Sequence, residues 1–450
     1  YYFIAFTALL IAVFFLLSSL YFRTHFYPGT IINGVGTAWL TEEEADRRLA
    51  NRAAVYTLVL KERGNVNEQI TGSEIELKLN PLHGGSACKD RQNRTFWIVS
   101  LLQHDSLRFE RAFTCDESLL RGRYDKLICR DATKIIEPKN ASLTYESGGY
   151  RIIEEVYGNQ LNEEMLYSKI KVAVENGSAE MDLEKMNCYI DPTIRSDSPK
   201  IKNTKKVAEG YIAARIIYTH AGGSEIVDES EISSWIEFDG DLNISFNEKK
   251  IGGFLYQLAA NYDTCGKERD FTTSLGNTIQ VGGGDYGWKV DIKKEKKILI
   301  DAVMRGGTTV REPEYSQRGA KHDINDIGST YVEINLTKQH LWYYDTGVLI
   351  AHGAVVTGDI NGGHRTPEGI YSLKYKIRNA VLKGTNYRTN VSYWMPFNND
   401  IGIHDAPWRT EFGRDIYLTR GSHGCVNVAF RLAETLFNKV EVGTPIVCYY

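Results

Sequence analysis

The first 22 residues contain no Asp, Glu, Lys or Arg, and this uncharged stretch limits what the chain can fold into more than any other feature. Its sequence is YYFIAFTALLIAVFFLLSSLYF. As a helix rising about 1.5 Å per residue, it would be about 33 Å long, enough to cross the hydrocarbon core of a bilayer. Tyr1, Tyr2 and Tyr21 fall at its two ends, where aromatic side chains prefer the membrane interface. We therefore expect a transmembrane helix over residues 1–22.

Two other interpretations of this stretch stay open. A buried core helix rarely has this length, and a cleaved signal peptide usually has a shorter apolar region followed by a small-residue cleavage site. Because the chain begins at Tyr1 rather than Met, we expect a cytoplasmic segment before it. The sequence itself does not give the orientation, since the flanking charges that set it are not available.

Composition excludes several classes of protein. The chain has 450 residues, of which 42% are hydrophobic and 24% charged, enough apolar material for two to four domains with their own cores. The net charge of -4 provides no broad basic surface, so we expect no nucleic-acid partner. Seven cysteines without a CxxC pair argue against a zinc ribbon or a dense disulfide framework.

The middle of the chain contains an internal repeat. Residues 157–177 and 286–306 align without a gap, and both begin with Tyr-Gly and end on Gly. Strand-like sequence precedes each of them, at 54–64 and 213–223. The pattern predicts two copies of one α+β unit.

Two polar segments separate these parts. Residues 196–206 lie between the copies and residues 311–328 follow the second, and both have the composition of linkers and turns. From Tyr331 onward, short runs of Val, Ile, Leu, Trp and Tyr alternate with polar residues and turn signals, which predicts a mainly β unit.

The most reactive residue types gather near the C-terminus, in GSHGCVN at 421–427. Residues 428–440 have helical apolar spacing, so we expect Cys425 to lie near a helix N-terminus, where its thiol pKa would be lowered. His404 follows an apolar strand-like run and could serve as a base. Gly421 and Gly424 would let backbone N–H groups approach a developing oxyanion. This combination suits acyl transfer through a thiol.

Two other chemistries are open to the same residues. His404, His423 and Cys425 could ligate zinc, although no fourth ligand or H-E-x-x-H helix accompanies them. Ser422 is the weaker candidate nucleophile, because its surroundings lack the G-x-S-x-G spacing and a cysteine is more nucleophilic near neutral pH.

The C-terminal unit resembles the catalytic domain of the L,D-transpeptidases of bacterial cell walls, the YkuD type. Their signature is a His, 14 to 17 residues, and then Ser/Thr-His-Gly-Cys-hydrophobic-Asn; here His404 is followed by 17 residues and then by SHGCVN. The segments INLTKQHLWYY, TPEG, YWMPF and IGIHDAPW also resemble sequences of this catalytic domain. The repeats resemble the peptidoglycan-binding domains of Gram-positive, membrane-anchored members, most clearly over residues 269–288.

The resemblance implies a role for each residue of the signature. Cys425 would be the nucleophile, His404 its base, and the backbone carbonyl of Asp405 would orient that base. Amides of His423, Gly424 and Cys425 would form the oxyanion hole. The residues implied to support the loop or contact substrate are Ser422, Asn427, Trp394 and Tyr393. No cofactor and no metal ion is implied.

The implied activity is formation of 3→3 cross-links between peptidoglycan stems, as part of cell-wall biogenesis and cell-shape maintenance. A cysteine acyl-enzyme forms on a tetrapeptide donor, D-alanine leaves, and a second stem is the acceptor. The family is also a carbapenem target. An L,D-carboxypeptidase using water, and a wall-binding scaffold with an idle catalytic domain, stay open as alternatives.

The expected architecture is multidomain, with two α+β repeats followed by the mainly β catalytic domain. The predicted limits are 1–22 for the membrane anchor, 27–197 and 205–322 for the peptidoglycan-binding repeats, and 325–450 for the catalytic domain. Since the substrate lies outside the membrane, we expect a single-pass cell-membrane protein whose catalytic part faces the wall.

Overall fold

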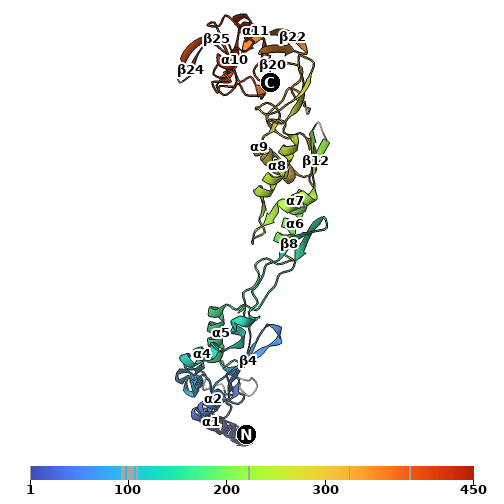
Figure 1. Cartoon of the computed structure of the whole chain (residues 1–450). Helices are drawn as coiled ribbons and strands as arrows, with labels where there is room; N and C mark the ends of the chain where they lie inside the picture. The colour runs from blue at the N-terminus through green and yellow to red at the C-terminus, as the bar shows by residue number, and fades with distance from the viewer. Residues whose placement is uncertain are drawn as a thin grey trace. The chain divides into compact units, whose positions relative to one another are not determined.

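The computed structural model describes residues 2–92, 97–98, 106–107, 110–220, 223–323, 325–384 and 387–450 (Figure 1). The chain divides into two compact units, one formed by residues 1–143 and 152–202, the other by residues 144–151 and 203–450.

The N-terminal stretch forms a single helix, α1 (Tyr2–Tyr21), as the sequence predicts, with Tyr1 outside the described residues. None of the residues of α1 is buried, and its mean hydropathy reaches 2.6 over an 18-residue window. A helix that is apolar on all sides and exposed on all sides has no protein core to cover it, which fits an anchor or a signal sequence.

The first unit contains one copy of the repeat. Its strand β3 (Thr57–Lys61) pairs antiparallel with β4 (Asn67–Thr71) and parallel with β10 (Glu180–Asp182). Besides α1, the described α-helices of this copy are α2 (Glu42–Ala54), α3 (Gly85–Asp90), α4 (Glu117–Tyr124) and α5 (Glu163–Glu175). The hydrophobic core lies between these helices and the small sheet, with Leu58, Leu60 and Ile70 completely buried.

The second copy repeats this topology. Strand β11 (Arg215–His220) pairs antiparallel with β12 (Gly223–Val227) and parallel with β18 (Thr308–Arg311). Its helices are α6 (Pro199–Ile212), α7 (Glu229–Trp235), α8 (Glu248–Tyr262) and α9 (Ile292–Arg305). In both copies a hairpin is followed by helices and by a third strand parallel to the first, so the α+β repeat predicted from the sequence is confirmed.

The two copies also begin their last helix in the same way. Asn162 caps α5 and Asp291 caps α9, and each side chain accepts a hydrogen bond from the backbone N–H three residues later. The two caps occupy equivalent positions of the gapless alignment. A shared cap fixes the start of both helices, because it satisfies an amide that the first turn leaves unpaired.

The C-terminal part is built on nine strands in the order β23-β28-β20-β21-β22-β27-β26-β25-β24 (orange to red in Figure 1). The strands are β20 (Tyr331–Asn335), β21 (His340–Asp345), β22 (Val348–Val356), β23 (Gly369–Ser372), β24 (Ile377–Gly384), β25 (Tyr387–Asn398), β26 (Ile401–Asp405), β27 (Val426–Val428) and β28 (Pro445–Tyr449). Helix α11 (Phe430–Lys439) packs on β22, β25 and β26, while α10 (Ile416–Thr419) is a single turn. The prediction of a mainly β unit is confirmed.

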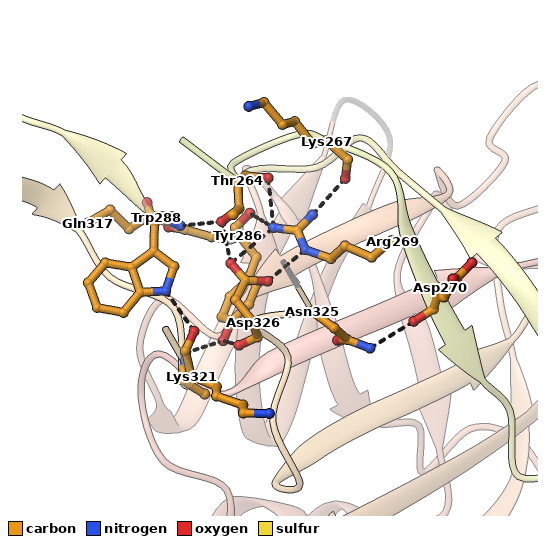
Figure 2. Close-up of polar contacts among 12 residues, drawn as sticks. Thr264, Lys267, Arg269, Asp270, Tyr286, Trp288, Gln317, Lys321, Asn325 and Asp326 are labelled. Carbon is orange, nitrogen blue, oxygen red and sulfur yellow. Dashed lines mark hydrogen bonds and ion pairs between the residues drawn. The ribbon is translucent and has the colours of Figure 1, made fainter. Parts of the chain in front are cut away.

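The two polar segments are more ordered than their composition suggests. Helix α6 (Pro199–Ile212) runs through the first connector. In the second connector, the completely buried Asp326 accepts a hydrogen bond from Nε of Arg269 at 2.6 Å, and Arg269 itself is buried (Figure 2). The expectation of two simple linkers is therefore wrong, because the first segment is largely helical and because, in the second, Arg269 satisfies the buried Asp326.

The hairpin of the second repeat packs directly on the C-terminal sheet. This hairpin is β15 (Arg269–Thr272) and β16 (Thr278–Val281), and its Phe271 and Val281 share a buried cluster with Ile370, Val447 and Tyr449. Gly284, at φ 74°, forms a bridge to Ile370 at the edge of the sheet, where an added Cβ would lie 2.0 Å from the Ile370 carbonyl oxygen. Glycine is required at this close approach.

Candidate active site

A pocket of about 210 Å³ opens over the strands β26 and β27. The residues that line it are Leu382, Thr389, His404, Trp408, Arg409, Gly421, Ser422, His423, Cys425 and Asn427. It therefore brings together most of the residues singled out in the sequence, including the candidate base and the candidate nucleophile.

The strand register explains why His404 and Cys425 meet. Strands β26 and β27 run parallel, with Ile403 opposite Val426 and His404 opposite Asn427. Cys425 directly precedes β27, so 20 residues of intervening chain return to the neighbouring strand beside His404. A base and a nucleophile at the ends of paired strands are held by the sheet rather than by a mobile loop.

His404 is almost completely buried, and both nitrogens of its ring have partners. Nδ1 lies 2.8 Å from the carbonyl oxygen of Asp405, which can only accept, so Nδ1 carries a proton. Nε2 lies 3.0 Å from Nδ2 of Asn427, which can only donate, so Nε2 offers its lone pair. Burial lowers the pKa of His404 below its ordinary value of 6.5, although the Asp405 carbonyl opposes this shift. The imidazole is neutral in this arrangement, with Nε2 able to accept a proton.

Cys425 is 8% exposed and lies in a small apolar cluster with Val391 and Trp394. Its Sγ is 3.5 Å from the carbonyl oxygen of Asp400. Burial raises the pKa of the Cys425 thiol to about 11, and the Asp400 carboxylate adds to the increase. The thiol is therefore protonated at neutral pH in this structure.

The predicted lowering of the thiol pKa by a helix N-terminus is wrong for this structure. Strand β27 (Val426–Val428) separates Cys425 from α11, which begins only at Phe430. The helix dipole acts mainly within the first turn, so it does not offset the burial of the thiol. The sequence pattern of α11 was recognisable, but the three-residue strand before it was not.

Ser422 and Thr366 shape the loop that carries Cys425. The Ser422 hydroxyl donates to the carbonyl oxygen of Cys425 and accepts from the backbone N–H of Gly424 at 3.1 Å. The buried Thr366 hydroxyl donates to the Gly424 carbonyl at 2.6 Å. The Gly424 amide, expected as an oxyanion donor, is thus engaged by Ser422 here. Gly424 has φ 116°, a conformation that side chains other than glycine rarely adopt.

The side chains of Tyr393, Trp394 and Asp405 lie outside the lining of the pocket, while the Asp405 backbone carbonyl contacts His404 as the resemblance implies. Tyr393 and Trp394 are not among the residues lining the pocket. The Tyr393 ring packs against Phe430 and Phe437, while Trp394 supports the His404 ring from 5.8 Å. The Asp405 carboxylate accepts from the Tyr393 backbone N–H at 2.8 Å, so it joins β25 to β26 instead of facing the pocket.

The zinc alternative receives no support from the geometry. Among the described residues, Glu62, Glu68 and Cys129 are the one group of three or more His, Cys, Asp or Glu side chains whose donor atoms lie within 4.8 Å of one another. His404, His423 and Cys425 do not form such a group, although all three are described. All seven cysteines are described, and Cys115, Cys129, Cys188, Cys265, Cys425 and Cys448 are free thiols.

Trp408 and Arg409 also line the pocket, although the sequence pattern did not indicate them. The Arg409 guanidinium donates through Nε to Oδ1 of Asn427 at 2.8 Å and through Nη2 to the Gly421 carbonyl at 3.1 Å. Trp408 lies 5.9 Å from the His404 ring and is half exposed. Their closeness in sequence to His404 was the available signal, since a residue just beyond a strand end often borders the same site.

Family models match most of the chain. The model of the L,D-transpeptidase catalytic domain matches residues 329–448, and the model of a peptidoglycan binding domain matches residues 109–182 and 195–311. A crystal structure of a cysteine-to-serine mutant of the Enterococcus faecium L,D-transpeptidase is 30% identical, covering 54% of this chain and 98% of that chain, with a TM-score of 0.45.

Two further relatives match shorter parts of the chain. The catalytic domain of the Enterococcus faecium L,D-transpeptidase acylated by ertapenem is 40% identical, covering 27% of this chain and 98% of that chain, with a TM-score of 0.26. "Probable L,D-transpeptidase 3" of Mycobacterium tuberculosis is 27% identical over 93 residues, which is 18% of this chain. The match spans 33% of the length of that curated relative.

Proposed function

Because the chain belongs to the L,D-transpeptidase family of cysteine-dependent, peptidoglycan cross-linking enzymes, we propose that it forms 3→3 cross-links through an acyl-enzyme on Cys425. The observation that carries the proposal is the pairing of a buried thiol with a neutral imidazole in one pocket, where Nε2 of His404 offers a lone pair. A neutral pair of this kind can move a proton as the new bond forms.

The acylation step follows from these positions. Nε2 of His404 takes the proton from Sγ of Cys425 once Asn427 gives up its hydrogen bond to that nitrogen. The sulfur attacks the carbonyl carbon of the third stem residue, and the bond to the nitrogen of the terminal D-alanine breaks. His404 returns the proton to that nitrogen, D-alanine leaves, and a thioester remains on Cys425.

Transfer uses the same groups in reverse. The side-chain amine of a second stem attacks the thioester carbonyl and loses its proton to His404, and the thiolate of Cys425 leaves and regains that proton. Buried surroundings suit this step, because water that reached the thioester would hydrolyse it. Cys425 is 8% exposed among apolar neighbours, which favours transfer over the carboxypeptidase alternative.

We assign the orienting role to backbone rather than to a third side chain. The Asp405 carbonyl holds Nδ1 of His404, while Ser422 and Thr366 brace the turn before Cys425. The amides of His423 and Cys425 remain our candidates for the oxyanion hole, with that of Gly424 joining them if Ser422 releases it. Neither a metal ion nor a cofactor enters these steps.

The proposed location follows from the substrate. Helix α1 anchors the chain in the cell membrane with one span, and the peptidoglycan binding repeats and catalytic domain face the wall. We keep the predicted limits of 27–197, 205–322 and 325–450 for the three extracellular domains.

Product analysis tests this function. The full chain in detergent is incubated with disaccharide tetrapeptides, and the products are weighed by mass spectrometry, with the Cys425→Ser variant as control. A cross-linked dimer that has lost one D-alanine supports transfer, and it should be absent from the variant. Tripeptide without dimer would establish the carboxypeptidase alternative, and unchanged substrate would establish an idle domain.

A further inference from the structure

Arg409 holds the two ends of the segment that carries the nucleophile. It follows β26 in a turn closed by its own N–H to the Ala406 carbonyl at 3.0 Å. Its guanidinium bonds the Gly421 carbonyl before Cys425 and the Asn427 side chain after it. A planar guanidinium can hold two acceptors at fixed angles, which a single ammonium cannot do.

The contact with Asn427 decides which way that amide points. Nε of Arg409 can only donate, so it requires the oxygen Oδ1 of Asn427 on its side. The Nδ2 group must then face Nε2 of His404, at 3.0 Å. A donor at this position pairs with a lone pair on Nε2 and opposes a proton there.

We propose that Arg409 is a positioning residue that fixes the Asn427 amide and, through it, keeps His404 in the tautomer whose Nε2 accepts the Cys425 proton. This inference rests on the proposed role of His404 as the base. With the amide reversed, Oδ1 would face Nε2 and favour a proton on it, while Nδ2 would face the donors of Arg409. If Nδ1 kept its proton and its hydrogen bond to the Asp405 carbonyl, the ring would carry two protons and a positive charge. If Nδ1 lost its proton, the ring would lose that hydrogen bond and its orientation.

The charge of Arg409 acts in the same direction as its geometry. Burial is the main cause of the lowered pKa of His404; the Arg409 guanidinium lowers this pKa further, because a nearby cation disfavours the imidazolium form, while the Asp405 carbonyl and carboxylate oppose the shift. The other contacts of the ring come from Trp394 on β25, Trp408 beyond β26 and Asn427 on β27, none of which titrates in the relevant range. Of these groups, Arg409 therefore acts on His404 in two ways: its charge disfavours the imidazolium, and its hydrogen bond sets the direction of the Asn427 amide.

Three variants separate these effects. Arg409→Gln removes the charge and the two-point contact, Arg409→Lys keeps the charge and one donor, and Arg420→Gln removes an exposed arginine close to the same loop. Each is made in the full chain in detergent, labelled with ¹⁵N-histidine. The ring nitrogen shifts of His404 report the tautomer, and intact-protein mass spectrometry gives the rate of acylation by a carbapenem across pH.

We expect Arg409→Gln to slow acylation at neutral pH by about tenfold or more, approaching the ~10⁴-fold cost of a wrong tautomer in imidazole-based catalysis. The fall of its acylation rate on the acid side of the pH profile should move to higher pH, because the cation that disfavours the imidazolium is gone. Arg409→Lys should recover part of the rate and the parent tautomer. Arg420→Gln should stay within about twofold of the parent, since exposed charges interact weakly.

A fourth variant keeps the test valid if Arg409→Gln unfolds. Asn427→Asp retains an acceptor for Arg409 and cannot donate to Nε2, so its acid limb should also move upward. The inference would be overturned if both Arg409→Gln and Asn427→Asp kept the His404 tautomer, the acylation rate and the acidic pH midpoint of the parent. A parent chain that forms no adduct on Cys425 would instead overturn the proposed function, whatever the variants do.

Discussion

The ring of His404 donates from Nδ1 to the backbone carbonyl of its own neighbour, Asp405, at 2.8 Å. The orienting group is thus part of β26 itself, and a side-chain substitution does not remove it. The other ring nitrogen, Nε2, carries the lone pair that can accept a proton in the pocket. The experiments below depend on this division of the two nitrogens.

The pH dependence of acylation should report a neutral thiol and a neutral imidazole. The pKa of His404 is lowered from 6.5 by burial, so the active neutral form should persist to more acidic pH than for an ordinary histidine. The rate should fall only when pH drops through that lowered pKa. Because the thiol pKa is raised to about 11, these two groups should cause no loss of rate between neutral pH and about pH 9. Single-turnover carbapenem acylation measured across pH checks this.

A resting thiolate–imidazolium pair would behave differently. The thiol would then titrate on the acid side and the imidazolium on the alkaline side, giving a bell with a decline between neutral pH and about pH 9. Observation of that bell would contradict the protonation states assigned here.

Removal of the base should slow the chemistry without removing the nucleophile. His404→Ala should reduce the rate of acylation by roughly 10²–10⁴-fold, the usual contribution of a general base. The matched control is His352→Ala, a histidine exposed on β22. Equal rates for the two variants, measured by adduct formation, would exclude His404 as the base.

The packing of the second repeat on the catalytic sheet gives a prediction about stability. The completely buried Glu333 accepts from the backbone N–H of Ser274 at 3.0 Å and from the hydroxyl of Tyr449 at 2.5 Å. Glu333→Ala leaves these donors unpaired, which should lower the unfolding free energy by about 2–5 kcal/mol. Calorimetry should show a lower melting temperature, whereas Glu411→Ala, at an exposed position, should leave it unchanged within error.

Deleting residues 1–22 should release the protein from membranes. Among the described residues, α1 is the one helix long and apolar enough to span a bilayer. The truncated chain should remain in the supernatant after carbonate washing and ultracentrifugation, while the full chain sediments with the membranes. Persistent sedimentation of the truncated chain would contradict a single anchor.

Local sequence patterns were sufficient to predict the helices and strands that position the site. The alignment of 157–177 with 286–306 predicted two copies of one unit, and the structure places the equivalent caps Asn162 and Asp291 at the start of matching helices. The signature from His404 to Asn427 likewise predicted a shared pocket, because its residues flank two short strands that pair.

The predictions that were wrong concerned residues whose environment is set by contacts distant in sequence. The segment 311–328 looked like a linker, and nothing local shows that Asp326 pairs with Arg269 in a buried site. The thiol pKa was predicted from a nearby helix, whereas the apolar neighbours Val391 and Trp394, contributed by β25, raise it. Arg409 was missed because its partner Asn427 lies on β27, far in sequence from the turn that carries Arg409.

The central claim is that Cys425 is a metal-independent nucleophile, and intact-protein mass spectrometry after carbapenem treatment tests it most directly. The parent chain, with and without EDTA, should gain the mass of one carbapenem, and peptide mapping should place it on Cys425. Cys425→Ser should gain none, since a hydroxyl paired with this base is a far poorer nucleophile. An adduct on another residue, or an adduct that forms only when zinc is supplied, would contradict the account.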